Sequence, residues 1–454
     1  MSPISSIRRR FVTAGVALAI AGTALLALTP TTTMASTGST SSVYYQVSPI
    51  ARLAVPSQGA TSGGFPLTPS QCVKQFGLAC YSPQDLQAGY QFPKQYTGSG
   101  KTIVIIDAYG SPTIKQDLAI YDQEFGLPHA NLNIFYPTGS PVYNPLQNHN
   151  ETSWAEETSL DVELSHGLAP GATIDLVIAP NNSGNALNNA EQYAVNSHLG
   201  QVMSMSFGAP ENAFQGNNDQ LTQAEAIYQQ AVSQGMSVFA SAGDSGATEG
   251  TSSPTALFPA SDPLVTSVGG TDLFLSNRGA YKSETTWNDS IPALCPFGCA
   301  YGPFGATGGA PSTLFTQPSY QVNDGQGFTT RTTSDVSFNA SVYTATMIYL
   351  GFLGSNNGFY FFGGTSEGSP SWAAITALAD QAAGRSLGEL NPLLYKIYHS
   401  GRTYAADFHN IYGSGQNNGF NGPGYPATSP GYNLPTGLGT PKVANLISSL
   451  SSGL

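Results

Sequence analysis

A small hydroxyl residue, Ser366, lies where a nucleophile could act. It belongs to the segment Gly364–Pro370, which follows an apolar run at 359–362 and leads into another at 371–375. Proline is tolerated in the first turn of a helix because its missing N–H would be unpaired there, so Pro370 predicts a helix that begins near Ser366. The free amides and dipole of a helix start favour negative charge, which suits a hydroxyl that attacks a carbonyl group. Serine also caps helices without any catalytic role, so this segment alone leaves both interpretations open.

A serine nucleophile needs a base, and a pair of carboxyl groups is the more suggestive choice. Glu157 and Asp161 are four residues apart in a predicted helix over 153–166, so they share one face. A pair that shares one proton could act first as base and then as acid in an acidic medium. An ordinary solvated helix face is the alternative. Six histidines lie in no recognisable catalytic pattern, and we interpret them as solvated or capping residues: His129, His149, His166, His198, His399 and His409.

A third carboxyl group follows an apolar segment at 236–240. It is Asp244, in the glycine-flanked loop Ser241–Gly246. If this loop faces Ser366, a protonated Asp244 could donate a hydrogen bond to a developing oxyanion, whereas a charged one would repel it.

The elements that must position these residues alternate between strands and helices. The apolar run 102–107 predicts a buried parallel strand. The alternation predicts an α/β fold with a mainly parallel, doubly wound sheet and helices on both faces, and with ligands bound at the strand C-termini. From Gly269 to Tyr360 we expect loops with short strands. Further strands are predicted at 173–178, 202–206 and 236–240, and further helices at 114–125, 186–198 and 220–234.

The N-terminus has the pattern of an exported protein. Arg8–Arg10 precede an apolar run from Phe11 to Leu28, which predicts a secretory signal peptide over residues 1–35. Residues 36–74 are predicted to be a linker or short pro-segment, and residues 75–450 to be one large catalytic domain. No later segment is long and apolar enough to span a membrane, so we expect a secreted, extracellular monomer.

The composition limits the classes of partner that the chain could bind and indicates the pH of its medium. Charged residues make up 9% of the 454 residues, with 15 Lys+Arg against 27 Asp+Glu. A chain with few cations accumulates little self-repulsion when its carboxylates take up protons, which favours an acidic medium over the alternative of a polar secreted protein. No basic patch is present, so nucleic acid is excluded as a partner. The four cysteines allow three pairings, and short loops favour Cys72–Cys80 and Cys295–Cys299.

Together these motifs resemble the sedolisin family of serine-carboxyl peptidases, endopeptidases with a subtilisin-like fold and an acidic working pH. The ordered set covers roughly residues 75–450. It comprises Gly-Thr-Ser-x-x-x-Pro at 364–370, Glu-x-x-x-Asp at 157–161, Ser-x-Gly-Asp-Ser-Gly at 241–246, Phe-Pro-Ala-Ser at 258–261, Val-Gly-Gly-Thr at 268–271, Asn-Pro-Leu-Leu-Tyr at 391–395 and Thr-Gly-Leu-Gly-Thr-Pro at 436–441.

The resemblance assigns roles to these positions. It implies that Ser366 is the nucleophile, Glu157 its general base and later acid, and Asp161 the carboxyl group that orients Glu157. Asp244 takes the place of the oxyanion-hole asparagine of subtilisins. Protein or peptide substrates would be hydrolysed through an acyl-enzyme. Asp107 is implied to be a supporting carboxyl group, and residues 204–208 the strand against which a substrate backbone pairs.

Three features depart from the family pattern. Its calcium site uses an Asp-Ile pair and a later Gly-Tyr-Asp, but this chain has Asn410-Ile411 and Gly431-Tyr432-Asn433. Calcium prefers charged oxygen ligands, so we expect its binding to be weak or lost. The family's long pro-domain has only some forty residues in its place, and Phe207 stands where several relatives carry Trp.

Three other functions compete with this interpretation. The segment Gly364–Gly368 also fits the G-x-S-x-G elbow of esterases, with Asp380 and either His399 or His409 as partners. A subtilisin-type triad of Asp107, His166 and Ser366 has the right chain order. A non-catalytic secreted binding protein on a peptidase scaffold is prompted by the altered calcium positions.

Overall fold

The computed structural model describes residues 42–47, 50–56 and 66–453, with gaps at 143, 145–146, 217, 290–304, 414, 420–421 and 429. The predicted signal peptide and the Cys295–Cys299 pair lie outside the described residues. Among the described helices, none has the length and apolar character to cross a membrane.

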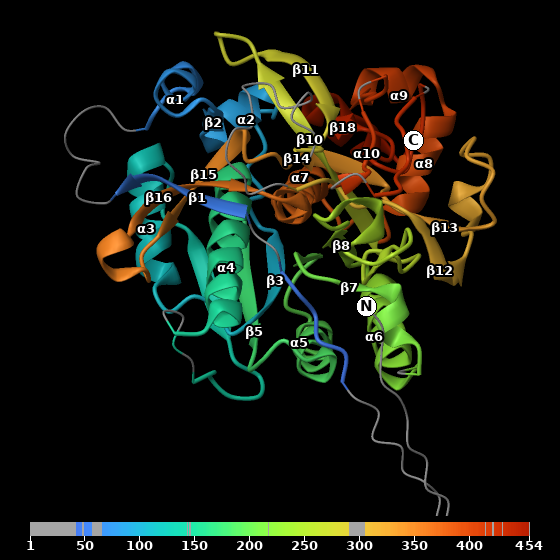
Figure 1. Ribbon diagram of the computed structural model, residues 1–454, viewed down its shortest axis with the longest axis horizontal. Helices are drawn as coiled ribbons and strands as arrows, with labels where there is room; N and C mark the ends of the chain where they lie inside the picture. The colour runs from blue at the N-terminus through green and yellow to red at the C-terminus, as the bar shows by residue number, and fades with distance from the viewer. Residues whose placement is uncertain are drawn as a thin grey trace, which may run out of the picture. The chain divides into compact units, whose positions relative to one another are not determined.

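A mainly parallel sheet organises the described residues (Figure 1). Eight strands take part, in the order β11-β10-β8-β6-β3-β5-β4 with β14 also paired to β10, and every pair is parallel except β10–β11. The predicted strands of the first half all belong to this sheet. Their bounds are β3 Thr102–Ala108, β4 Asn131–Phe135, β5 Thr173–Ala179, β6 Val202–Met205, β8 Ser237–Ser241, β10 Thr266–Leu275, β11 Tyr281–Thr286 and β14 Val336–Asn339.

Helices cover both faces of this sheet, as predicted. Alternate side chains of β3 divide between two cores, because a strand directs successive residues to opposite faces. Ile103 and Ile105 join the core that contains α4 and α7, while Val104 and Ile106 join the core that contains α5 and α6. The helices are α1 Pro69–Phe76, α2 Pro83–Gly89, α3 Ile114–Phe125, α4 His149–Leu168, α5 Gly184–Asn196, α6 Asn218–Ser233, α7 Gly368–Ala383, α8 Asn391–His399, α9 Arg402–Asp407 and α10 Val443–Ser452.

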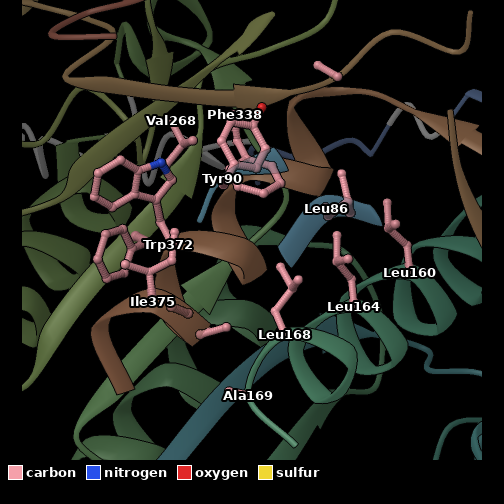
Figure 2. Close-up of a cluster of buried hydrophobic side chains, with 14 of the residues drawn as sticks. Leu86, Tyr90, Leu160, Leu164, Leu168, Ala169, Val268, Phe338, Trp372 and Ile375 are labelled. Atoms are coloured by element: carbon pink, nitrogen blue, oxygen red, sulfur yellow. The ribbon is translucent and has the colours of Figure 1, made fainter. Parts of the chain in front are cut away.

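The larger core fixes α4 and α7 relative to the sheet. Leu160, Leu164 and Leu168 recur every four residues on α4 and so point to one side (Figure 2). Trp372 of α7 is fully buried in the same core. The predicted helix 153–166 therefore exists and is longer at both ends.

The second half contains more sheet than its loop-rich sequence predicts. β15, Thr344–Leu350, and β16, Gly358–Gly363, pair antiparallel in a separate four-stranded sheet with the order β1-β16-β15-β2. β2 spans Ala79–Tyr81. β1, Ile50–Pro56, lies in the segment interpreted as linker and pairs antiparallel with β16. Shorter paired strands are β7 Ala209–Pro210, β9 Leu257–Phe258, β12 Pro311–Thr316, β13 Thr330–Thr332, β17 Phe408–His409 and β18 Thr440–Pro441.

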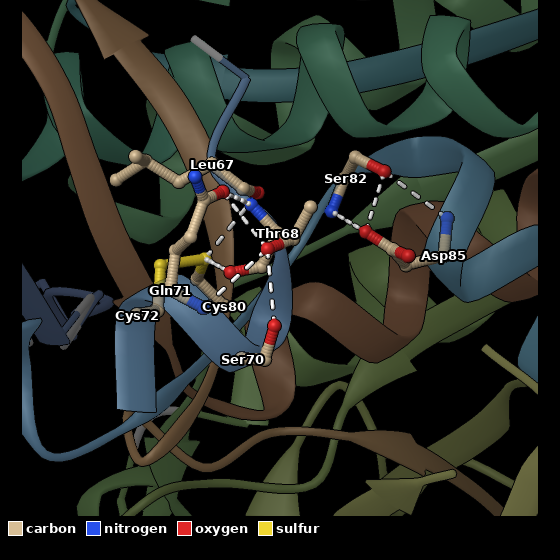
Figure 3. Close-up of a disulfide and its surroundings, with 8 residues drawn as sticks. All are labelled: Leu67, Thr68, Ser70, Gln71, Cys72, Cys80, Ser82 and Asp85. Atoms are coloured by element: carbon tan, nitrogen blue, oxygen red, sulfur yellow. Dashed lines mark hydrogen bonds between the residues drawn. A yellow bond between two sulfur atoms is a disulfide. The ribbon is translucent and has the colours of Figure 1, made fainter. Parts of the chain in front are cut away.

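The predicted Cys72–Cys80 disulfide is present and links α1 to β2 (Figure 3). Two capping boxes flank it, because Thr68 caps α1 and Ser82 caps α2 through reciprocal side-chain bonds. These capping bonds therefore fix the backbone at the starts of α1 and α2, the two helices that precede β3 of the main sheet.

Candidate active site

The C-terminal ends of the parallel strands bring the candidate residues together. Asp107 is the penultimate residue of β3, Ser206 follows β6 and Asp244 follows β8. Helix α4 supplies Glu157 and Asp161, and the turn before α7 supplies Ser366. A cavity of about 290 Å³ opens here and is lined in part by Ser366, Thr365, Asp244 and Ser206.

The nucleophile candidate lies in a tight turn and not in the first turn of an α-helix. Thr365–Glu367 form a 3-10 turn, and α7 begins at Gly368, two residues later than predicted. The carboxyl group of Asp244 explains the difference, because its Oδ1 accepts from both the N–H and the hydroxyl of Thr365 at 2.7 Å. Gly364 has φ 125°, and a Cβ there would lie 2.7 Å from Oδ2 of Asp244, so only glycine fits.

Glu157 and Asp161 form a fully buried pair beside this turn. Ser206 donates from its hydroxyl to Oδ1 of Asp161 at 2.8 Å and lies 3.5 Å from the carbonyl oxygen of Ser366. No described residue makes a hydrogen bond of ordinary geometry to either carboxyl oxygen of Glu157. The Ser366 hydroxyl is nevertheless close enough to lower the pKa of Glu157 partly, against the larger raising effects of burial and of Asp161.

Asp107 adds a third carboxyl group to the pair. Burial raises its pKa to about 7, and its charge in turn helps to raise the pKa of both Asp161 and Glu157. Burial is the largest cause for Asp161 as well. No cation is among the groups that shift the pKa values of these three acids. Ionising all three would therefore carry a large electrostatic penalty, so together they retain protons and titrate as one coupled group.

Asp244 faces the cavity from the opposite loop. Burial raises its pKa to about 6, although the two bonds from Thr365 partly offset the rise. Both bonds go to Oδ1, so Oδ2 is the atom that can carry a proton. Below about pH 6 the side chain is therefore a hydrogen-bond donor at the cavity.

Sequence reasoning did not assign the polar residues that connect these groups. Ser206 had only a place in a substrate strand, and its bond to Asp161 spans 45 residues. Thr365 belongs to the nucleophile motif, but its bond to Asp244 spans 121 residues. Glu249 lines the same cavity, and its Oε2 accepts from the N–H of Ser245 at 3.3 Å. No local pattern signals such pairs.

The histidines have other partners. His166, expected to be a solvated or capping residue, is buried in the last turn of α4, and its Nε2 lies 3.0 Å from Asp122 and 2.9 Å from the carbonyl oxygen of Pro128. His409 is also partly buried and stacks on Tyr281 at 3.6 Å. Asp380 accepts from the N–H of Leu387 at 2.8 Å. Within the part of the chain that the structure describes, these contacts involve neither Ser366 nor its turn.

An extended segment of the chain itself runs along the rim of the cavity. Residues 43–47 lie between the loop after β5 and the loop after β6. Gln46 and Gly208 exchange two backbone bonds of 2.9 and 3.1 Å, and their pairing is antiparallel. On the other side the N–H of Tyr45 donates to the carbonyl oxygen of Asn182, and Gly184 donates to Val43. Gln46 and Val47 then line the cavity that contains Ser366.

Tyr45 anchors this segment. Its side chain is 2% exposed, whereas the adjacent Tyr44 is 58% exposed. Its ring packs edge-on against Phe207 at 5.2 Å and lies 6.0 Å from Phe214. Phe207, the residue that departs from the family's Trp, is thus a wall of an aromatic pocket.

The residues at the implied calcium site do not fit a cation. The Nδ2 amide of Asn410 donates to the carbonyl oxygen of Gly431 at 2.9 Å, and its Oδ1 accepts from the N–H of Gly431 at 3.0 Å. Asn433 donates in the same way to the carbonyl oxygen of Ile411 at 3.0 Å. The carbonyl groups that could bind a cation are thus occupied by amide donors, and no charged oxygen is supplied by these residues.

Comparison with known proteins gives a consistent result. The profile of the Subtilase family matches residues 143–397. Kumamolisin from Bacillus sp. (strain MN-32) is 31% identical over 385 residues, which cover 82% of this chain and 63% of kumamolisin. Sedolisin from Pseudomonas sp. (strain 101) is 30% identical over 383 residues, which cover 81% of this chain and 60% of sedolisin. The chain thus spans less than two thirds of the length of these two relatives.

A solved structure extends the similarity to three dimensions. Pseudomonas sedolisin complexed with two molecules of pseudo-iodotyrostatin matches with a TM-score of 0.71 at 28% identity. The match covers 83% of this chain and 99% of that chain.

The hydrogen bonds made by the side-chain amides of Asn410 and Asn433 predict that calcium does not stabilise the folded chain. The unfolding midpoint in urea should be equal in millimolar calcium and in EDTA. The double variant Asn410→Asp/Asn433→Asp should acquire a calcium-dependent midpoint, because carboxylates replace the amide donors. Asn445→Asp, on the exposed start of α10, is the control. A midpoint of the parent chain that rises with calcium would contradict the prediction.

The buried acids predict a chain that is more stable in acid than at neutral pH. Unfolded carboxyl groups ionise near pH 4, so folding is not penalised below that pH. Stability should fall as the pH rises through the folded-state pKa values, about 6 for Asp244 and about 7 for Asp107. Urea midpoints from pH 3 to 8, measured on Ser366→Ala to prevent any self-digestion, test this. Asp107→Asn in that background should flatten the fall, and a midpoint that rises towards neutral pH would refute it.

Proposed function

The chain belongs to the sedolisin family of serine-carboxyl peptidases, and we propose that it is a secreted, acid-acting serine-type endopeptidase. The observation that carries the proposal is the convergence of the Ser366 turn with the buried Glu157–Asp161 pair. Ser206 donates to Asp161 and lies 3.5 Å from the carbonyl oxygen of Ser366, and the Ser366 hydroxyl partly lowers the pKa of Glu157. The catalytic residues would be Ser366, Glu157, Asp161 and Asp244, and the substrates protein or peptide chains.

In the proposed reaction, Glu157 removes the proton of Ser366 as its Oγ attacks the peptide carbonyl carbon. The buried carboxylate of Glu157 is a stronger base than an exposed one, because its pKa is raised. Asp161, fixed by Ser206, keeps a proton and orients Glu157. Glu157 then gives its proton to the leaving amine, and water hydrolyses the acyl-enzyme by the same route in reverse.

Asp244 would stabilise the tetrahedral intermediate. Its protonated Oδ2 can donate to the oxyanion while Oδ1 remains bound to Thr365. Because ionisation removes the donor and adds a repelling charge, this role is limited to pH values below about 6, the value to which burial raises its pKa.

The position of residues 43–47 supports a peptide as substrate. The groove between the loops after β5 and β6 pairs with an extended backbone on both sides, and this backbone leads towards Ser366. Backbone pairing of this kind binds peptides with little dependence on sequence, whereas side-chain pockets give preference. A substrate chain in this track would place one side chain where Tyr45 lies.

The first prediction from this proposal concerns pH and two variants. Hydrolysis of denatured protein should be fastest in acid and decline above about pH 6, as Asp244 ionises. Ser366→Ala should abolish it, and Glu157→Gln should lower kcat by about 10³-fold, because general base catalysis is lost. A pH–rate profile of the purified chain and of both variants measures this.

The competing functions give different results in the same assay. Fastest hydrolysis at neutral pH would favour a histidine base. Cleavage of short esters without cleavage of peptides would favour an esterase. A purified chain that is inactive at every pH would favour a binding protein on this scaffold and would overturn the proposal.

The second prediction concerns the aromatic pocket of Tyr45. An amidated peptide with the sequence of residues 43–47, Val-Tyr-Tyr-Gln-Val, should inhibit hydrolysis competitively. Replacing the residue that corresponds to Tyr45 by Ala should weaken inhibition by about 10- to 100-fold, since a buried aromatic side chain contributes about 1.5–3 kcal/mol. Inhibition constants at one acid pH measure this.

The matched control replaces the residue that corresponds to Tyr44, whose side chain is mostly exposed. This change should leave inhibition almost unaltered. The chain's own segment competes with added peptide, so the comparison between peptides is decisive and not the absolute constant. Equal inhibition by both alanine peptides would remove Tyr45 as a guide to substrate binding.

A further inference from the structure

Glu367, the residue after the nucleophile candidate, is a buried carboxyl group that the proposed reaction does not use. It is 0% exposed, as the last residue of the 3-10 turn that contains Ser366. Its backbone is fixed twice, because its N–H donates to the carbonyl oxygen of Gly364 and its carbonyl oxygen accepts from the hydroxyl of Ser371. Its side chain extends away from the cavity to two strands of different sheets.

One oxygen of Glu367 receives both side-chain bonds. Oε2 accepts from the Nδ2 amide of Asn339 at 3.0 Å and from the hydroxyl of Thr346 at 2.7 Å. Asn339 ends β14 in the main sheet and Thr346 lies in β15 of the second sheet. Oε1 is buried and has no hydrogen-bond partner among the described residues.

The donor Asn339 is itself rigidly placed. Its Oδ1 accepts from the N–H of Leu273 and the hydroxyl of Thr344, and its Nδ2 also donates to the carbonyl oxygen of Thr344 at 2.7 Å. A side chain fixed at this many points can hold whatever it binds. Glu367 is therefore tied to a rigid part of both sheets.

The turn is thus held from two sides. On the cavity side Asp244 binds Thr365, and on the opposite side Asn339 and Thr346 bind Glu367. Ser366 lies between these two attachments. A change of a few tenths of an ångström in either one would move the hydroxyl relative to Glu157, which matters because reaction rates depend steeply on alignment.

We propose that Glu367 is a positioning residue, which holds the Ser366 hydroxyl against Glu157 by tying its turn to β14 and β15. This inference rests on the proposed function for its effect on rate. It does not require Glu367 to touch the substrate.

The surroundings of Glu367 favour its neutral form. Burial raises its pKa, the bonds from Thr346 and Asn339 partly offset the rise, and Asp244 raises it further. Tyr121 of α3 also interacts with it, and α4, which packs against the turn, carries the acids Glu157 and Asp161, whereas Glu163 of the same helix bonds to Tyr349 of β15. No described Lys or Arg contributes to the shift in the pKa of Glu367. A neutral Gln should therefore substitute for Glu367 with little change.

The test compares Glu367→Gln and Glu367→Ala in the full chain, with rates expressed per active site from the acyl-enzyme burst. Glu367→Gln should keep kcat within about twofold in acid and show the same decline above about pH 6 as the parent, because Asp244 is unchanged. Glu367→Ala should lower kcat by about tenfold or more at unchanged KM, since the peptide track at Gln46 and Gly208 does not contact it.

Glu163 provides the matched control. It is a buried carboxyl group of α4. One of its oxygens accepts from the N–H of Tyr349 at 2.8 Å, and the other has no hydrogen-bond partner in the described part of the chain. Glu163→Ala should lower the melting temperature and leave kcat per active site unchanged. An equal kcat in Glu367→Ala and the parent would show a merely structural role and overturn the inference.

A second measurement separates this inference from the proposed function. The amide of Gly364 donates to the carbonyl oxygen of Ala340, and the amide of Glu367 donates to the carbonyl oxygen of Gly364, so their hydrogen exchange should speed up in Glu367→Ala and not in Glu163→Ala. If no peptide is cleaved at any pH, the proposed function fails, and unchanged exchange would then refute the positioning of the turn. In a chain without activity, faster exchange in Glu367→Ala would still support the positioning of the turn.

Discussion

Burial of carboxyl groups without compensating cations is the constraint on which the rest of this structure depends. Helix α4 is buried from Glu157 to Leu168, although this stretch also carries Asp161, Glu163 and His166. Among the described residues, the ion pairs are those of Asp122 with two histidines and of Asp335 with Arg331. A buried charge without a partner is far more costly than a buried neutral acid. The interior therefore favours protonated carboxyl groups, and this property connects the candidate base, the candidate oxyanion donor and the stability of the fold.

The first half of the fold and the local part of the site could be predicted from the sequence. Apolar runs such as 102–107 and 173–178 mark strands β3 and β5, and the four-residue spacing of Glu157 and Asp161 already places both on one helix face. These signals are local, so one segment contains all the information. Strands β15 and β16 are neighbours in sequence, but glycine-rich surroundings conceal them, and β1 depends on β16, a partner far along the chain.

The contacts within the site were not predictable for the same reason. Asp161 meets Ser206, and Asp244 meets Thr365, only because strand ends and a turn converge in space. The α-helix predicted to begin near Ser366 begins two residues later. Helix propensity alone predicted the earlier start, whereas Asp244 stabilises a 3-10 turn around Ser366 through Thr365. The solvated or capping role expected for His166 did not include its burial, which depends on Asp122 and Pro128 from another segment.

The C-terminal loops show the complementary use of groups that do not titrate. The side-chain amides of Asn410 and Asn433 connect these loops by hydrogen bonds. The Nδ2 amide of Asn417 joins them to the carbonyl oxygens of Gly308 and Gly309, at 3.0 and 2.9 Å. A carboxylate cage for calcium would lose charge, and hence its ion, as protons bind in acid. Hydrogen bonds from side-chain amides keep their strength over the same pH range, because amides do not titrate there. The loops therefore remain joined under the conditions in which the acids near Ser366 hold their protons, so a change of pH acts on the site and not on these joints.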